Sequence, residues 1–486
     1  MFRKSILSFL ITIIGGCFIF AYLSVFSGQR GILAESTPVV SNVSDNQTTS
    51  ITVSPIAPLS AGNNSTTVVE DIINGRLTGN IFTAESDNLT VLLVDKSTEN
   101  LYVVGIDSDK PALKSIFNVY TGKSPGDKIK AGDMKTPEGI YFIQKYIQSG
   151  SLNNAIFGGA GAFTLNYPNV YDRNYGKTGY GIWIHGRGSD KPDERTKGCV
   201  SLNDKDLNIL KNHVVVETPV IISHQLDFLN PSEYSVEKDK YFKMFDDYVA
   251  SLQNKKYDEF KEYFDESFKD SNGLELKDYL LNLKEATTNK KIQLDVSGLT
   301  IFKENNSELM YQYKEFYCAD KITNGTRRLY LHKKDDDKYK IIAEEFYPNG
   351  SIEVLLYDQI NQLIDNWRKS WLNKDIDKYI SYYSKSFSTK GMNLVGWKRY
   401  KQRVFEKSTI KDISINDLTI VYDKNTNEIF ATFNQRYVSN SVDDKGVKTL
   451  IVEGCPGNFK IKAEEWGDVK ELVTVSQKKT AIKASF

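Results

Sequence analysis

The stretch Ile182–Asp206, IWIHGRGSDKPDERTKGCVSLNDKD, holds a histidine at the end of an apolar run and a cysteine fourteen residues later, His185 and Cys199. Each has a glycine beside it, Gly186 or Gly198, and glycine allows a backbone to approach a substrate closely. A thiol nucleophile needs a base to take its proton, and histidine suits that task near neutral pH. The stretch therefore predicts a cysteine-dependent active site on a loop that follows a strand.

The composition is that of a folded protein with several domains. A chain of 486 residues is long enough for roughly three domains. Lys and Arg total 62, as do Asp and Glu, so the net charge is zero. Because nucleic-acid binders normally carry a strongly basic domain, no nucleic-acid partner is expected.

The few cysteines and histidines limit the disulfide and metal chemistry that we expect. The 4 cysteines are far apart and form no Cys-x-x-Cys pair, and the 4 histidines form no His-Glu-x-x-His motif. Neither a disulfide framework nor a metal site is therefore predicted, and no cofactor is predicted either. Outside the opening stretch, the residues of both types that we interpret as structural are His213, His224, His332, Cys318 and Cys455.

The N-terminus predicts a membrane anchor. Arg3 and Lys4 precede an uncharged run, Ser5–Phe26, that is long enough to span a bilayer as a helix. With the basic residues inside, the bulk of the chain would lie outside the cytoplasm. In a competing interpretation, Ile14–Cys17 resembles a bacterial lipobox, and Cys17 would then be the lipidated first residue of a lipoprotein.

The first folded domain is expected to consist mostly of β-strands. Asn88–Asp107 has the pattern of a strand, a polar turn and a second strand. Either Asp204 or Asp206 is expected to cap a short helix that runs to about His213. Further apolar runs that predict strands are Phe117–Tyr120, Ile140–Ile143, Ile182–His185 and Val214–Ile222.

This domain resembles the YkuD-type L,D-transpeptidase catalytic domain. The family pattern joins His-Gly to a later Ser/Thr-x-Gly-Cys and an apolar residue, matched here by His185-Gly186 and Thr196–Val200. A Thr-Pro-x-Gly strand entry upstream is matched by Thr136–Gly139. The resemblance implies an acyl-enzyme reaction on peptidoglycan stem peptides, at the bond between the diamino acid and D-Ala, without metal or cofactor.

The resemblance also implies roles for single residues. Cys199 would be the nucleophile and His185 the general base, and the carbonyl of Gly186 would orient the imidazole. Backbone N–H groups around Gly198 and Cys199 would form the oxyanion hole. The residues expected at the oxyanion and substrate site are Gly198, Lys197, Thr196 and Ser201.

Two of these positions depart from the family pattern. Lys197 stands where many members have histidine, and Ser201 stands where many have arginine or asparagine. Lys197 either lowers the thiol pKa or holds a substrate carboxylate, or it is a solvated loop lysine. Both positions flank the substrate site, so the choice between an amine, which cross-links, and water, which trims, stays open.

The second half of the chain contains an internal duplication. Tyr248–Phe268 matches Trp367–Phe387 at an offset of 119 residues, and Leu299–Ile301 repeats at Leu418–Ile420 with the same offset. Such a constant offset indicates two copies of one domain. In each copy a helical periodicity precedes alternating strand patterns. This order predicts an α+β fold similar to the nuclear-transport-factor-two-like cone fold.

The duplicated domains are interpreted as structural or targeting modules. Neither copy repeats a histidine or a cysteine, so we expect no catalytic role, and the fold suggests a protein partner or a dimer contact. Joined to a YkuD-type domain, they make the chain similar to cell-shape-determining L,D-carboxypeptidases, which carry one such domain and trim tetrapeptides to tripeptides. Three functions stay open: L,D-transpeptidase, L,D-carboxypeptidase and a non-catalytic wall-binding scaffold.

The predicted architecture is multidomain: a mostly-β catalytic domain and two α+β cone-shaped domains behind an N-terminal transmembrane helix. The expected segments are the cytoplasmic stub and anchor (1–35), a flexible Ser/Thr-rich linker (36–84), the catalytic domain (85–225), copy 1 (236–350), copy 2 (355–470) and a tail (471–486).

Overall fold

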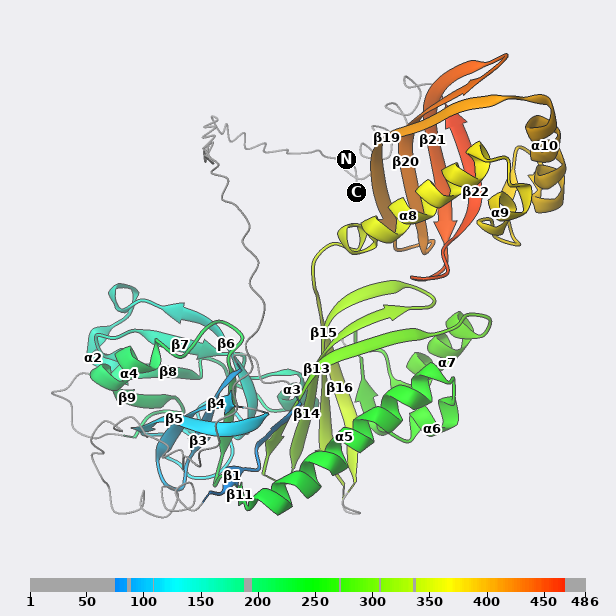
Figure 1. The fold of residues 1–486 in the computed structure, drawn as a ribbon. Helices are drawn as coiled ribbons and strands as arrows, with labels where there is room; N and C mark the ends of the chain where they lie inside the picture. Colours follow the sequence, from blue (N-terminus) through cyan, green and yellow to red (C-terminus); the bar gives the residue numbers. More distant parts are fainter. Residues whose placement is uncertain are drawn as a thin grey trace, which may run out of the picture. The chain divides into compact units, whose positions relative to one another are not determined.

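The computed structural model describes residues 75–84, 89–107, 109–187, 195–270, 272–305, 307–334 and 338–467. Both the expected anchor, with the alternative lipidation site Cys17, and the tail 471–486 lie outside these residues. Among the helices of the described ranges, none combines the length and the apolar character needed to cross a membrane. The folded parts are a first domain and two copies of a second type of domain (Figure 1).

The first domain is built on an eight-stranded sheet, which confirms the expectation of a mostly-β domain. The hairpin expected within Asn88–Asp107 is present, with Leu93 opposite Tyr102. In sheet order the strands are β5 (Lys110–Asn118), β4 (Asn100–Asp107), β3 (Thr90–Asp95), β10 (Pro219–Ser223), β6 (Gly139–Ile147), β7 (Ala162–Leu165), β8 (Trp183–Arg187) and β9 (Val200–Asn203). The short helices are η1 (Ser149–Ser151), α2 (Asn154–Phe157), α3 (Val170–Asn174) and α4 (Asp204–Leu210).

The cap of helix α4 differs from the expected one. Asn203, rather than Asp204 or Asp206, is the N-cap, and its side chain accepts the backbone N–H of Asp206 at 2.9 Å. The two aspartates instead lie in the first turn, where negative charge is favourable beside the helix N-terminus. The helix also ends at Leu210, before His213.

The expected linker 36–84 is wrong at its C-terminal end. Leu77–Thr78 forms β1, which pairs with β11 (Phe228–Leu229), and Ile81–Thr83 forms β2. Strand β2 pairs with β13 (Gln293–Glu304) of copy 1 and not with the first domain. Strands of two or three residues are too short to show the alternation of apolar and polar residues by which strands are predicted, so the sequence did not indicate this pairing.

The two copies have closely similar element orders, as the duplication predicts: two helices, a third helix after one or two short strands, and then four long strands. Copy 1 consists of α5 (Pro231–Gln253), α6 (Tyr257–Lys261), β12 (Phe264–Lys269), α7 (Leu276–Thr287), β13, β14 (Glu308–Cys318), β15 (Ile322–Lys333) and β16 (Tyr339–Pro348). Copy 2 consists of α8 (Ile352–Leu372), α9 (Ile376–Ser381), β17 (Ser388–Thr389), β18 (Met392–Asn393), α10 (Leu394–Lys407), β19 (Ile410–Asp423), β20 (Glu428–Ser439), β21 (Asp443–Glu453) and β22 (Lys460–Gly467).

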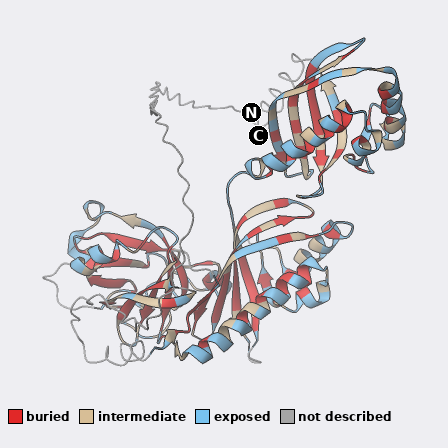
Figure 2. Cartoon of the chain, viewed as in Figure 1, coloured by how far each residue is buried: buried red, intermediate tan, exposed pale blue. Residues whose placement is uncertain are grey.

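In each copy a long helix covers one face of a sheet whose four long strands are antiparallel. Helix α5 lies across the sheet of copy 1, and α8 lies across that of copy 2 (Figure 1). Both helices have a buried side and an exposed side (Figure 2), as amphipathic helices do. Copy 1 starts at Pro231, earlier than expected, because Asn230 and Glu233 form a capping box with proline in the first turn.

The first domain and copy 1 share one hydrophobic core. Phe142 of β6 meets Phe302 of β13 edge to face, with ring centroids 6.4 Å apart, and both side chains are fully buried. Arg328 of β15 lies 3.3 Å above the Phe142 ring centroid and pairs with Glu217 at 2.5 Å. His332, interpreted as structural, contacts the first domain through Nδ1, 2.7 Å from the Tyr171 hydroxyl. These contacts bury side chains of both domains in one cluster.

We predict that Phe302→Ala destabilises the first domain and copy 1 together. Removing a fully buried phenylalanine lowers the free energy of unfolding by about 3–5 kcal/mol, measurable by urea denaturation. Val421, at the matching position of copy 2, is 53% exposed, so Val421→Ala should change stability by less than about 0.5 kcal/mol. Equal effects of the two substitutions would contradict the shared core.

Copies 1 and 2 are joined by a disulfide, which the sequence did not predict. Cys318, at the end of β14, bonds to Cys455, which follows β21, with Cα atoms 5.8 Å apart and a sequence separation of 137. The expectation that the cysteines form no disulfide was therefore wrong for this pair, although both residues are structural, as interpreted. Beside the disulfide, the Ile322 N–H donates to the Tyr422 hydroxyl at 2.7 Å. The expectation failed because the partners come from different copies and have no characteristic spacing.

We predict that the double substitution Cys318→Ser and Cys455→Ser lowers the stability of copy 2. Opening so long a loop should cost about 2–5 kcal/mol. Four of the 5 tryptophans lie in copy 2, at positions 367, 371, 397 and 466, so their fluorescence during urea unfolding reports on this domain. Cys199→Ser is the control and should not shift the transition. Two free thiols at these positions in the oxidised native protein would refute the pairing.

Candidate active site

The parallel pairing of β8 and β9 brings the predicted pair together. His185 lies opposite Ser201, and Ile184 lies opposite Val200. Cys199 comes directly before β9, two residues from Ser201, and alternate residues of a strand share one face of the sheet. His185 and Cys199 are thus diagonal neighbours on that face.

The imidazole of His185 is held from two sides. Its side chain is buried, and Nδ1 lies 2.8 Å from the carbonyl oxygen of Gly186. Because a carbonyl oxygen only accepts, Nδ1 carries the proton and Nε2 keeps the lone pair of a base. The Phe157 ring of α2 packs against the imidazole edge to face at 5.2 Å.

Cys199 is a half-buried free thiol. Its Sγ lies 3.5 Å from the carbonyl oxygen of Gly181, to which the thiol donates. Burial raises the pKa of Cys199 above its ordinary value, and the Trp183 backbone N–H and the Lys128 ammonium partly offset this rise. At neutral pH the sulfur is therefore protonated, and forming a thiolate requires a base.

Glycines let the backbone pack closely behind His185. A Cβ atom at Gly186 or at Gly158 would lie 2.2 Å from Oδ1 of Asp204. The Gly159 N–H donates to the other carboxylate oxygen of Asp204 at 2.6 Å. The Gly-rich stretch before β7 therefore packs β8 against the start of α4, which fixes the strand that carries His185.

The four residues expected to bind substrate differ from one another in burial and in hydrogen bonding. Thr196 Oγ1 accepts the Gly198 N–H at 3.0 Å and donates to the Cys199 carbonyl at 2.6 Å. The Gly198 N–H is thus already bonded, which corrects its expected place in an oxyanion hole. Lys197 is exposed. Ser201 is buried, and its backbone exchanges two hydrogen bonds with that of Tyr120, both 2.8 Å long.

Lys128 is a charged residue near the site that the sequence did not reveal. Its buried Nζ pairs with Asp133 at 2.6 Å. Burial alone would raise the pKa of Asp133. Hydrogen bonds from Lys128 and from three backbone N–H groups lower this pKa by more than burial raises it, so the net shift is downward. A Cβ at Gly179 would lie 3.0 Å from Lys128 Cε, so this lysine packs against the segment that leads to Gly181.

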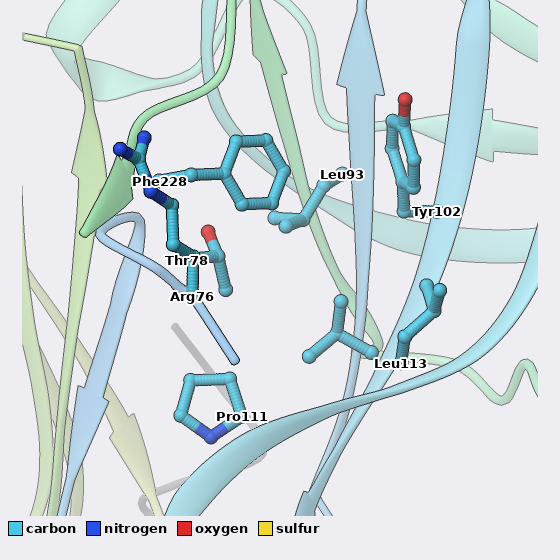
Figure 3. A pocket seen from close by; sticks show the side chains of 8 residues that line it. Arg76, Thr78, Leu93, Tyr102, Pro111, Leu113 and Phe228 are labelled. Carbon is cyan, nitrogen blue, oxygen red and sulfur yellow. The ribbon is translucent and has the colours of Figure 1, made fainter. Parts of the chain in front are cut away.

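A pocket formed by described residues of the first domain includes neither His185 nor Cys199. It is small, about 30 Å³, and lies between the N-terminal strand residues and β4–β5 (Figure 3). Its lining is mostly apolar and contains neither a cysteine nor a histidine. Within the described ranges, no three His, Cys, Asp or Glu side chains gather in a way that could hold a metal ion.

The comparisons with known proteins agree with this geometry. Residues 89–222 match the YkuD family, described as the L,D-transpeptidase catalytic domain. Residues 359–483 match the Cds6 C-terminal NTF2-like domain. The chain carries a YkuD-type L,D-transpeptidase catalytic domain and a C-terminal NTF2-like domain. The first domain is accordingly the catalytic domain, and copy 2 is the NTF2-like domain.

Solved structures resemble the chain over part of its length. Bd1075 of Bdellovibrio bacteriovorus is 26% identical with a TM-score of 0.52, and the match covers 57% of this chain and 99% of that one. The helical cell shape determining protein Pgp2 from Campylobacter jejuni is 23% identical with a TM-score of 0.46, and the match covers 55% and 95%. No curated protein sequence matches the chain.

We predict that Lys128, and not Lys197, tunes the Cys199 thiol. Lys128→Met removes a cation that lowers the pKa of Cys199, so that pKa should rise further. Lys197→Met should leave it unchanged, because Lys197 is exposed. The measurement is the pH dependence of iodoacetamide labelling at Cys199, followed by mass spectrometry. A rise with Lys197→Met and none with Lys128→Met would reverse the assignment.

Proposed function

We propose that the chain is a cysteine acyltransferase of peptidoglycan stem peptides, an L,D-transpeptidase. The observation that carries the proposal is the placement of His185. Its Nδ1 is bonded to the Gly186 carbonyl, which leaves Nε2 as a base on the sheet face that carries Cys199. The match of residues 89–222 to the L,D-transpeptidase catalytic domain supports the substrate class.

The reaction begins with a proton transfer. His185 Nε2 takes the proton of Cys199 Sγ, and the thiolate attacks the carbonyl carbon of the diamino acid. The backbone N–H of Cys199 stabilises the oxyanion. When the tetrahedral intermediate collapses, the C–N bond breaks, and the D-Ala nitrogen leaves with the proton from the His185 imidazolium. The product is a thioester at Cys199, and the sequence of steps uses neither metal nor cofactor.

The second half-reaction decides between the two enzyme functions. An amine from another stem peptide attacks the thioester and gives a cross-link, as in a transpeptidase. Water in the same position gives a free tripeptide, as in an L,D-carboxypeptidase. Both routes restore the thiol with help from His185 as base. We propose that the protein acts mainly as a transpeptidase. The alternative, carboxypeptidase activity, is distinguished by the tetrapeptide assay described below.

The proposed location is the outer side of the cytoplasmic membrane. The Cys318–Cys455 disulfide supports an oxidising compartment, and the apolar run Ser5–Phe26 supports a membrane anchor, with lipidation at Cys17 as the alternative. Peptidoglycan stem peptides are exposed on that side of the membrane. The two repeated domains would hold the catalytic domain in place and offer surfaces for a protein partner or a dimer.

We predict that the purified protein converts a disaccharide tetrapeptide into cross-linked dimer or free tripeptide, separated by liquid chromatography and mass spectrometry. Cys199→Ala should reduce either product by at least about 10³-fold, because the nucleophile is lost. Lys398→Met, a change at a half-buried position of copy 2, is the control. A carbapenem should also add its mass at Cys199. Undiminished turnover by Cys199→Ala would show that Cys199 is not the nucleophile, whereas a native protein with neither turnover nor a carbapenem adduct would be a wall-binding scaffold.

A further inference from the structure

Copy 1 contains a cavity of about 420 Å³ between helix α7 and the sheet. Its lining includes Asn282 and Ala286 of α7 and also Lys321, which lies between β14 and β15. All three residues are exposed, so the cavity is open to solvent on this side. Pockets of this size commonly hold small organic molecules. Copy 1 therefore has room for a ligand of that size.

The walls of the cavity are rich in aromatic side chains. The face of an aromatic ring is electron-rich and attracts a cation that lies within about 6 Å of its centroid. The lining also contains the Thr323 hydroxyl, which is buried without a hydrogen-bond partner among the described residues. A hydroxyl oxygen can accept the N–H of such a cation. The aromatic residues of the lining are Tyr248, Tyr279, Tyr313, Tyr317 and Phe346.

The charges of the cavity wall are negative in sum. Arg327 pairs with Glu315 at 2.7 Å and with Glu344 at 2.8 Å, and both carboxylates are buried. One positive and two negative charges give −1. Of the two Glu344 oxygens, Oε1 has no hydrogen-bond partner among the described residues. A further −1 comes from the other charged residues of the lining, which are Asp270, Asp320 and Lys321. The wall therefore favours a cation over an anion.

The duplication shows which residue of copy 2 occupies the corresponding position. Helices α7 and α10 start at Leu276 and Leu394, so Leu283 in the cavity wall corresponds to Lys401. The Lys401 side chain is 5% exposed. Copy 2 thus buries an amine of its own where copy 1 has a leucine beside a cavity.

The amine of Lys401 is held by aromatic rings. Its Nζ lies 3.8 Å from the Trp371 ring centroid and 4.8 Å from the Trp397 ring centroid. By the repeat offsets, the counterparts of these tryptophans in copy 1 are Leu252 and Tyr279. Both line the cavity. The framework of this domain therefore accommodates an amine at this position, and in copy 1 the chain does not supply one.

We infer that copy 1 binds a primary alkylammonium in this cavity, at the position that the Lys401 side chain has in copy 2. The ammonium has three N–H donors, and Glu344 Oε1 and the Thr323 hydroxyl are acceptors for two of them. The aromatic rings surround the charge, and the leucines of the lining contact the alkyl stem. One ammonium also neutralises the −1 of the buried group formed by Arg327 and its two glutamates.

The test is isothermal titration calorimetry of the full chain with n-butylammonium chloride, whose four-carbon stem matches that of lysine. We expect saturable binding at one site. The neutral analogue 1-butanol should bind at least about tenfold more weakly, because it lacks the charge. Nα-acetyl-lysine N-methylamide presents the same ammonium on a peptide backbone. Tighter binding of this compound than of butylammonium would indicate a peptide as the natural source, and weaker or equal binding would indicate a free amine.

Two substitutions give copy 1 the residues of copy 2. Leu283→Lys supplies the cation from the chain itself, and Glu315→Gln removes one buried negative charge, since copy 2 has Gln435 there. Each should weaken butylammonium binding at least about tenfold. The matched controls are exposed positions of α7: Leu281→Lys and Glu285→Gln should bind butylammonium like the native chain.

Three outcomes would overturn the site: no saturable binding of butylammonium, equal affinity for 1-butanol, or native affinity in a folded Leu283→Lys or Glu315→Gln variant. Circular dichroism shows whether each variant folds. If neither does, Thr323→Val exchanges only a hydroxyl for a methyl group and should weaken binding several-fold, and native affinity in that variant would equally refute the site. Because binding is measured without turnover, the result does not depend on the proposed transpeptidase reaction.

Discussion

The parallel pairing of β8 with β9 is the constraint on which the active site depends. Parallel strands cannot be joined by a tight hairpin, so the chain must travel back before the second strand begins. This return places Cys199 at the start of β9, one diagonal step from His185. The Gly186 carbonyl then fixes the tautomer of the imidazole, and the glycines around Asp204 let β8 sit close to its neighbours. Residues fourteen apart in sequence are thus carried by neighbouring strands of one sheet.

The duplicated domains show how one framework supports different chemistry. Both copies place a basic residue of the third long strand against a glutamate of the fourth, Arg327 with Glu344 and Lys448 with Glu464. Around this common pair, copy 1 keeps a cavity and copy 2 fills the space with larger aromatic rings and Lys401. A duplication of this kind keeps the buried ion pair, which is costly to break, while the residues around it diverge.

Sequence reasoning found the features that have a local or periodic signal. The first hairpin and the repeat at 119 residues have such a signal, and the structure has both of them; the His185–Cys199 pair has one too and stays a prediction. It missed features whose partners are far apart. Strand β2 is too short to show a period, and Cys318 and Cys455 belong to different copies. In the sequence, nothing distinguishes Lys128 from other lysines in turns, because its partner Asp133 is identified only by the structure. In the same way, the hydrogen bond from the Gly198 N–H to Thr196 depends on side-chain geometry, which the sequence does not show.

Strand β2 also constrains how the protein can be synthesised and folded. The ribosome makes β2 first and the catalytic domain next, yet the partner of β2 is a strand of copy 1. The Asn80 side chain, for example, donates to a carbonyl 223 residues further along the chain. Such a distant contact forms late, because domains fold in the order in which they emerge. The catalytic domain therefore has an unfinished surface until copy 1 emerges, and a chain truncated in between would expose apolar side chains that invite aggregation.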